Sequence, residues 1–199
     1  MVPTDAELVS RARGNEMGAF RQLVDRYKRR AYYTALGIVG NHHDAEDVMQ
    51  ESFLQALRSL DRLRNPGGFC AWLLRIAYNR SIDLRRRRLR EVSPDGREDG
   101  VELFDTIGSE SAENNPERSM RSGEIAGLVM STMEKLPESQ RVAFALKHIG
   151  QLSIKEIAAA TGSTESTTKT NIYRAVQRMR KVLSPLRIQG SGVADERVS

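Results

Sequence analysis

Residues 69–88 combine an aromatic ring, an amide and guanidinium groups at a spacing that a helix would bring into one row. Positions i, i+3, i+7 and i+14 of a helix lie along the same side. Aromatic rings stack on unpaired bases, and amide and guanidinium groups donate hydrogen bonds to bases and phosphates. The row therefore predicts contact with a single nucleic-acid strand. Its members are Trp72, Arg75, Asn79 and Arg86.

Basic and flexible residues surround this row. Residues 85–88 are four consecutive arginines, which exceed what a helix dipole requires and favour phosphate binding. In front of the helix, residues 64–68 read RNPGG, a loop whose glycines leave room for a backbone or an extruded base. The structural alternative is that Trp72 covers the hydrophobic core and that the arginines only compensate the dipole.

An earlier helical segment carries acid on one side. Asp44, Asp47 and Glu51 fall at i, i+3 and i+7, with Gln50 beside them. Interaction with the helix dipole accounts for carboxylates in a first turn, but it accounts poorly for Glu51. Because such a stripe would repel phosphate, we predict that it docks on a basic protein surface. The alternative is a solvated helix face.

Residues 153–183 have the pattern of two helices joined at a glycine. Ser153 and Glu156 form a capping box, Gly162 supplies the turn, and a second helix is predicted to begin near Thr164. This order is typical of a helix-turn-helix, whose second helix reaches base edges and phosphates. Paired helices with a glycine turn also occur as plain packing units. The predicted outer face comprises Glu165, Thr168, Lys169, Tyr173, Arg174, Arg178 and Lys181.

The sequence does not indicate an enzyme, a cofactor or a metal centre. It contains no glycine-rich phosphate loop and no nucleophile signature, and its single cysteine, Cys70, excludes an intrachain disulfide and cysteine-rich zinc sites. His42 and His43 are adjacent, so they would point about 100° apart on a helix and would not share a metal. Without a signal peptide or an apolar run of roughly 20 residues, we expect a cytoplasmic protein that does not insert into membranes.

The elements that must position these residues are predicted to be helices. Of the 199 residues, 39% are apolar and only 6% are aromatic, which favours aliphatic, helical cores. Helical periodicity covers residues 5–13, 17–36, 44–60 and 69–88, and Thr4 with Glu7 forms a capping box at the start of the first of these segments. The third of these helices is expected to be capped by His43 or Asp44, and residues 137–150 form one more helix. Because no segment alternates as a strand does, the predicted fold class is all-α.

Charge divides the chain into parts. Residues 1–90 hold 17 basic and 10 acidic side chains, residues 91–119 hold 2 and 9, and residues 120–199 hold 12 and 7. We therefore expect two small helical domains, 1–90 and 120–184, joined by an acidic, flexible linker at 91–119 and followed by a polar tail at 185–199. Two basic domains suit two contacts with one polyanion. The alternative is positive charge that only keeps a protein in solution.

These motifs, in this order, resemble the sigma factors of bacterial RNA polymerase, in particular the extracytoplasmic function (ECF) group. The resemblance covers residues 5–183 and is weakest across the linker. DAEDVMQESFLQAL is similar to the segment that docks on the clamp helices of the largest polymerase subunit. FCAWLLRIAYNRSIDLRRRR is similar to the segment that opens and captures the minus-ten promoter element, and DRLRNPGG stands in the place of the loop that holds a flipped base. LPESQRVAFALKHIGQLSIKEIAAATGSTESTTKTNIYRAVQRMR is similar to the domain for the minus-thirty-five element.

The resemblance implies an alternative sigma subunit, not an enzyme, that binds core RNA polymerase and directs promoter-specific transcription initiation. It would recognise the minus-thirty-five duplex and the melted single-stranded minus-ten element, and an inhibitory anti-sigma factor would be a further partner. Polymerase binding would fall to Asp44, Asp47, Gln50 and Glu51. Minus-ten binding would fall to Arg64, Trp72, Arg75, Asn79, Arg86 and Arg87. Minus-thirty-five binding would fall to Thr168, Lys169, Thr170, Asn171, Tyr173, Arg174 and Arg178.

The predicted recognition helix departs from this family. The family usually has a PxGTV turn before its basic residues, whereas this chain has TESTT, which brings Glu165 near DNA and puts Thr168 where an apolar residue normally packs. Asn171 stands in place of the usual arginine. Two rival functions stay open at this point. One is a stand-alone helix-turn-helix regulator that binds duplex DNA without polymerase, and the other is an adaptor that binds polymerase without directing initiation.

Overall fold

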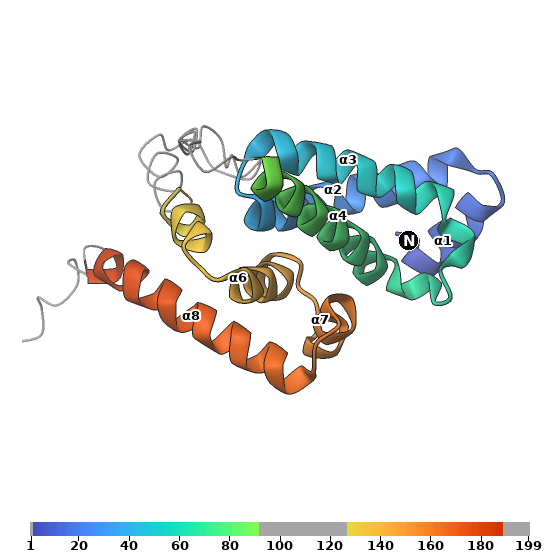
Figure 1. Ribbon diagram of the computed structural model, residues 1–199. Helices are drawn as coiled ribbons and strands as arrows, with labels where there is room; N and C mark the ends of the chain where they lie inside the picture. Colours follow the sequence, from blue (N-terminus) through green and yellow to red (C-terminus); the bar gives the residue numbers. More distant parts are fainter. Residues whose placement is uncertain (1, 92–126, 189–199) are drawn as a thin grey trace, which may run out of the picture.

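The computed structural model describes residues 2–91 and 127–188, and every regular element in them is helical (Figure 1). The prediction of an all-α fold is confirmed, since these residues contain no strand. Residues 92–119 of the predicted acidic linker (91–119) and residues 189–199 of the predicted polar tail (185–199) lie outside the described residues, while residues 185–188 are the end of a helix.

Four helices form the N-terminal half. The first begins at the predicted capping box, in which Thr4 Oγ1 accepts from the Glu7 amide and the Glu7 carboxylate accepts from the Thr4 amide. The prediction for the third cap was wrong: Asn41, which has extended backbone, caps that helix by accepting from the amide of Asp44, while His43 is already helical. The helices are α1 (Asp5–Arg13), α2 (Met17–Val39), α3 (His42–Arg58) and α4 (Phe69–Glu91), with single turns η1 (Leu60–Arg62) and η2 (Pro66–Gly68) before α4.

The C-terminal half contains the predicted helix-turn-helix. Ser153 and Glu156 form the second capping box, and Gly162 ends the first of its two helices in a left-handed conformation with a φ of 66°. The helix predicted at 137–150 is α-helical at first and then π-helical. In chain order, a helix at 127–134 is followed by α6 (Glu138–Phe144), the π-helical turn η3 (Ala145–Ile149), α7 (Ile154–Thr161) and α8 (Glu165–Ile188).

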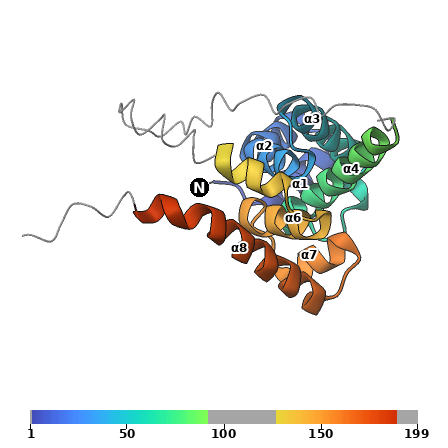
Figure 2. The same ribbon diagram turned by 60° about the vertical axis from the view of Figure 1, so that its left-hand side comes forward.

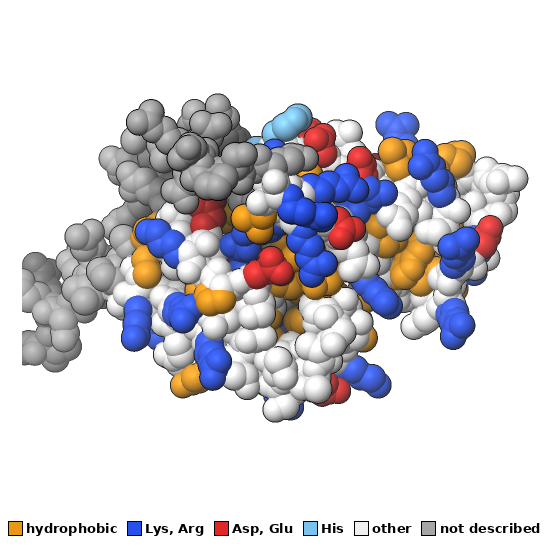
Figure 3. Space-filling view, viewed as in Figure 1, with side chains coloured by type: hydrophobic (Ala, Val, Ile, Leu, Met, Phe, Trp, Pro, Cys, Tyr) orange, Lys and Arg blue, Asp and Glu red, His pale blue; other side chains and the backbone are white. Residues whose placement is uncertain are grey.

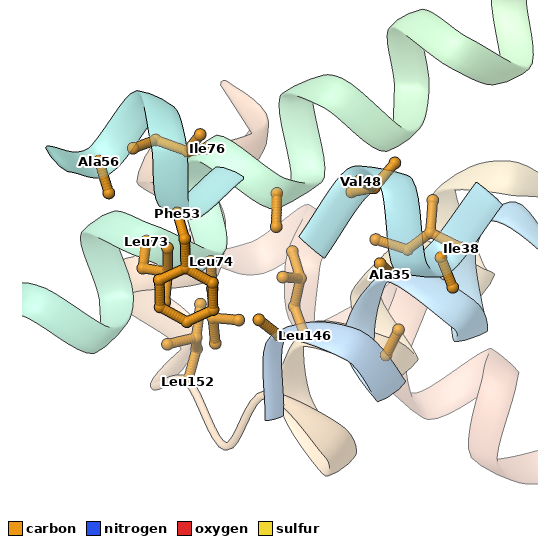
Figure 4. Close-up of a cluster of buried hydrophobic side chains, with 14 of the residues drawn as sticks. Ala35, Ile38, Val48, Phe53, Ala56, Leu73, Leu74, Ile76, Leu146 and Leu152 are labelled. Carbon is orange, nitrogen blue, oxygen red and sulfur yellow. The ribbon is translucent and has the colours of Figure 1, made fainter. Parts of the chain in front are cut away.

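A single hydrophobic cluster runs through both halves. Phe69, which is 0% exposed at the start of α4, packs edge-on against Phe20 of α2 with ring centroids 6.4 Å apart. Leu74 lies farther along α4, and Figure 4 shows Leu146 and Leu152 of the C-terminal half in the same cluster of buried side chains. The two halves therefore share one core.

Glycines let the halves approach closely. A Cβ on Gly37 of α2 would lie 3.0 Å from Met133 Cε and 3.2 Å from Ile149 Cδ1, so a larger residue there requires a shift of its neighbours. A Cβ on Gly150 would lie 3.0 Å from Leu74 Cδ1. Figures 1 and 2 agree that α6 and α7 lie between α8 and the helices of the N-terminal half. One long side of α8 is therefore left facing solvent.

The boundary between the halves also buries a guanidinium group. Arg141 of α6 is 3% exposed, and its Nη1 donates to the carbonyl oxygen of Glu134 at 3.3 Å. Among the described residues, its Nε has no hydrogen-bond partner, and the same is true of Arg85 Nε on α4. Burial, with the nearby charge of Arg85 as the second cause, lowers the pKa of Arg141 to about 10. This charge is therefore held at a cost to stability.

Candidate functional site

The acidic stripe of α3 has one buried member, Asp44, which is 4% exposed. Its carboxylate accepts from Arg88 Nη2 at 2.5 Å and from Asn41 Nδ2 at 2.8 Å. Both partners belong to this chain, and the pair with Arg88 joins the start of α3 to the end of α4. Asp44 was predicted to contact a partner protein, but in this conformation its carboxylate is occupied by internal contacts.

The other members of the stripe, Asp47, Gln50 and Glu51, are exposed. Glu51 is paired, because Nη1 of Arg80 on α4 donates to its Oε2. Arg80 Nε also donates to Gln55 Oε1 at 3.0 Å, so one guanidinium binds two side chains that are a helical turn apart on α3. Sequence reasoning missed Arg80, because only the packing of α4 on α3 brings it to the stripe.

The row predicted to contact a single strand lies along one side of α4. Trp72 is half-buried, with its ring centroid 6.1 Å from that of Phe69, so it packs on the core and also reaches the surface. Arg64 is exposed in the turn before the helix. The exposed members of the row are Arg75, Asn79 and Arg86, whose side chains bind no other side chain among the described residues. These donors are therefore available to a ligand.

The four arginines near the end of α4 have different contacts. Arg85 Nη1 donates to the carbonyl oxygen of Ile38 at 3.1 Å, and Arg88 pairs with the buried carboxylate at the start of α3. These two arginines hold α4 against α2 and α3, a tertiary role that neither phosphate binding nor compensation of the helix dipole predicted. Arg87 is exposed and lines a pocket with residues of α3. Of the run, Arg86 alone belongs to the Trp72 row.

The outer side of α8 is exposed and basic, and Figure 3 shows Lys and Arg side chains spaced along this helix. Tyr173 is 65% exposed, and Asn171 is half-buried. Thr168 is 2% exposed and its hydroxyl shares a hydrogen bond with Ser163 Oγ at 2.9 Å, so it packs inside the turn rather than facing a ligand. The remaining members of the predicted face, Glu165, Lys169, Arg174, Arg178 and Lys181, are exposed, and so is Thr170, which the family resemblance added.

Metal binding, a reactive thiol and a membrane-spanning helix find little support in the residues that the structure describes. In 2–91 and 127–188, no three His, Cys, Asp or Glu side chains are grouped so that they could hold a metal ion. Burial raises the pKa of the Cys70 thiol, and the contact from Arg30 Nη1 at 3.4 Å opposes this shift, so the thiol is not an activated nucleophile. No helix in the same residues is long and apolar enough to cross a membrane.

Comparison with known protein families matches both halves of the chain. Sigma-70 region 2 matches residues 23–91, and sigma-70 region 4 matches residues 126–179. The ECF RNA polymerase sigma-E factor of Escherichia coli strain K12 is 35% identical over 184 residues, which cover 92% of this chain and 96% of that relative. This chain belongs to the ECF sigma factors. The sigma factor SigW of Bacillus subtilis strain 168 is 31% identical over 185 residues, covering 89% and 96%.

Solved structures resemble this sigma factor in fold. CnrH, solved in complex with the cytosolic domain of CnrY, has a TM-score of 0.62 and 26% identity, covering 91% of this chain and 97% of that one. RpoE of Bartonella quintana, solved with the anti-sigma factor NepR, has a TM-score of 0.65 and 23% identity, covering 83% and 96%. Because RpoE is only 23% identical to this chain, that likeness shows a common fold alone.

Family membership confirms the resemblance seen in the motifs. The protein is a sigma factor, which binds core RNA polymerase and directs transcription initiation at promoters. Sigma factors in general are initiation factors and not catalysts. The stand-alone regulator is therefore set aside.

Proposed function

We propose that this sigma factor uses three exposed surfaces on three helices, each for a different partner. The docking surface on the polymerase clamp helices is Asp47, Gln50 and Glu51 of α3. The surface for the melted minus-ten strand is Arg64 with Trp72, Arg75, Asn79 and Arg86 of α4. The surface for the minus-thirty-five duplex is Lys169, Thr170, Tyr173, Arg174 and Arg178 of α8, with the half-buried Asn171 beside them.

One observation carries this proposal: exposed acid lies on α3, whereas exposed basic side chains lie on α4 and α8. A polyanion is repelled by the first surface and attracted by the other two. Asp44 and Thr168 are buried, so we leave them out of the proposed contact surfaces. Their side chains instead bind Arg88 and Ser163 within the protein. Arg87 leaves the minus-ten surface because it lies on the side of α4 that faces α3.

Use of both promoter elements requires the halves to separate. The minus-ten and minus-thirty-five elements lie about 25 base pairs apart, as their names indicate, which is roughly 85 Å at about 3.4 Å per base pair. The 24 residues of α8 span only about 36 Å at 1.5 Å per residue, and its domain packs directly on the N-terminal half. We therefore propose domains at 1–90 and 120–184 that share a core in this conformation and part on the promoter.

The regulatory partner and the setting of the protein are also proposals. Bartonella quintana RpoE was solved with an anti-sigma factor, and we propose a partner of that class here. The protein would act in the cytoplasm, without catalytic activity of its own.

Run-off transcription tests the function directly. Core RNA polymerase, with and without this protein, is supplied with a pool of genomic promoter fragments. Discrete transcripts that depend on the protein support the proposal and reveal its promoter. No protein-dependent transcript from any fragment would contradict the proposed use of the two promoter elements.

Variants test the surfaces separately. Asp47→Arg with Glu51→Arg should abolish the complex with core polymerase on size exclusion and leave the fold intact.

Lys169→Ala with Arg174→Ala should reduce promoter output and keep the polymerase complex. Arg21→Ala with Lys135→Ala removes the same charge from exposed positions outside the proposed surfaces and serves as the control. Unchanged output from the α8 variant would remove those residues from the DNA surface.

A further inference from the structure

A pocket lies between α3 and α4, beside the proposed docking surface. Its volume is about 150 Å³. Since one water molecule takes up about 30 Å³ in the liquid, the end of a long side chain fits into it. Val48 and Leu84 contribute apolar lining. Figure 3 shows acidic and basic side chains intermixed where these two helices lie side by side.

Acidic side chains in this pocket outnumber basic ones. Asp47 and Glu51 come from α3 and Asp83 comes from α4, while the basic members are Arg80 and Arg87, both of α4. Arg80 is already paired with Glu51. Because Arg80 is paired with Glu51, the carboxylates of Asp47 on α3 and Asp83 on α4 remain on the two walls of the pocket. Arg87 is the one other basic side chain among the lining residues.

The two remaining carboxylates lack a strong internal partner. Asp47 faces His43, whose Nε2 lies 3.8 Å away. In the part of the chain that the structure describes, Asp83 forms no ion pair and its carboxylate accepts no hydrogen bond. Because both are exposed, an incoming cation could bind them without first breaking an internal pair.

We propose that this pocket receives one lysine or arginine side chain from the polymerase surface on which α3 docks, and that Asp83 is a docking residue. The apolar lining takes the methylene stem of the incoming side chain, and the carboxylates bind its charged end. The occupant is basic because the pocket carries a net negative charge. This inference rests on the proposed docking of α3 and extends the docking surface onto α4.

The affinity of the full chain for core polymerase, measured without promoter DNA, tests this proposal. Fluorescence anisotropy of an N-terminal label gives the Kd for Asp83→Arg, Asp83→Asn and Asp83→Glu. We expect Asp83→Arg to weaken binding by about tenfold or more, and Asp83→Glu to keep it within about threefold. Binding by Asp83→Asn should fall less steeply with added salt than binding by the unaltered chain. Asp61→Asn is the matched control, since its side chain is 91% exposed and lies outside the pocket.

The outcomes separate this inference from the function on which it rests. Unchanged affinity of Asp83→Arg, with binding lost by Asp47→Arg plus Glu51→Arg, would overturn the pocket and leave α3 docking in place. Unchanged affinity of both would overturn α3 docking as well. Equal losses for Asp83→Glu and Asp83→Arg, with a lowered melting temperature, would show a structural role for Asp83 and would also overturn the proposal.

Discussion

Arg30 of α2 donates a hydrogen bond from Nη2 to Oε1 of Gln151, which lies 3.1 Å away and 121 residues later in the chain. The other end of the same guanidinium contacts the sulfur of Cys70 at the start of α4. The two halves are thus joined by a polar contact at the surface as well as by the apolar core beneath it.

A bulky residue at Gly37 should disturb the packing of the halves. We expect Gly37→Leu to lower the free energy of unfolding by about 1–3 kcal/mol, because an added side chain overpacks the space against Met133 and Ile149. Gly18→Leu, on the same helix with open space around it, should instead raise stability by about 0.5–1 kcal/mol. Urea unfolding measures both, and small-angle scattering detects opening. Equal stabilisation by the two variants would contradict the close approach at Gly37.

Removal of the buried charge on Arg141 should stabilise the protein. Its lowered pKa means that folding disfavours the charged form, so this cost persists below about pH 10, at every physiological pH. Arg141→Met keeps the volume and removes the charge, and we expect a gain of about 1–2 kcal/mol at neutral pH. Chemical denaturation measures it, with Arg141→Lys as the variant that keeps the charge. A loss of stability in the methionine variant would contradict the expectation.

The capping box at the start of α7 should contribute measurably to stability. Ser153→Ala removes the hydroxyl that accepts from the Glu156 amide, and we expect a loss of about 1 kcal/mol. Ser139→Ala is the control, since that serine is exposed and its hydroxyl binds nothing among the described residues. Differential scanning calorimetry compares the two. The same melting temperature for both variants would mean that the cap is dispensable.

His148 should make stability fall in mild acid. Burial, and then the charge of Lys147, lowers its pKa, while its ring packs on that of Phe144 with centroids 4.6 Å apart. The unfolded chain, with a pKa near 6.5, therefore binds the proton more readily, so stability drops as pH falls through about 6.5 and below. His148→Gln should flatten this dependence in urea unfolding between about pH 5 and 8. An unchanged pH profile would assign the effect to other groups.

The sequence by itself determined the elements and the sides on which their residues lie. The capping boxes at Thr4 and Ser153 and the turn at Gly162 involve groups within a few positions of one another, so local patterns predicted them. The row from Trp72 to Arg86 follows from helical spacing in the same way. Sequence motifs also identified the family, because their order along the chain is itself a sequence property.

Only the tertiary structure decided what covers each side. Asp44 is buried and paired with Arg88, 44 residues away, and Glu51 is paired with Arg80, 29 residues away. Nothing local signals these contacts, nor the core shared by the two halves. The physical reason is that helical periodicity sets the direction of a side chain but not its neighbour, and burial and ion pairing depend on that neighbour.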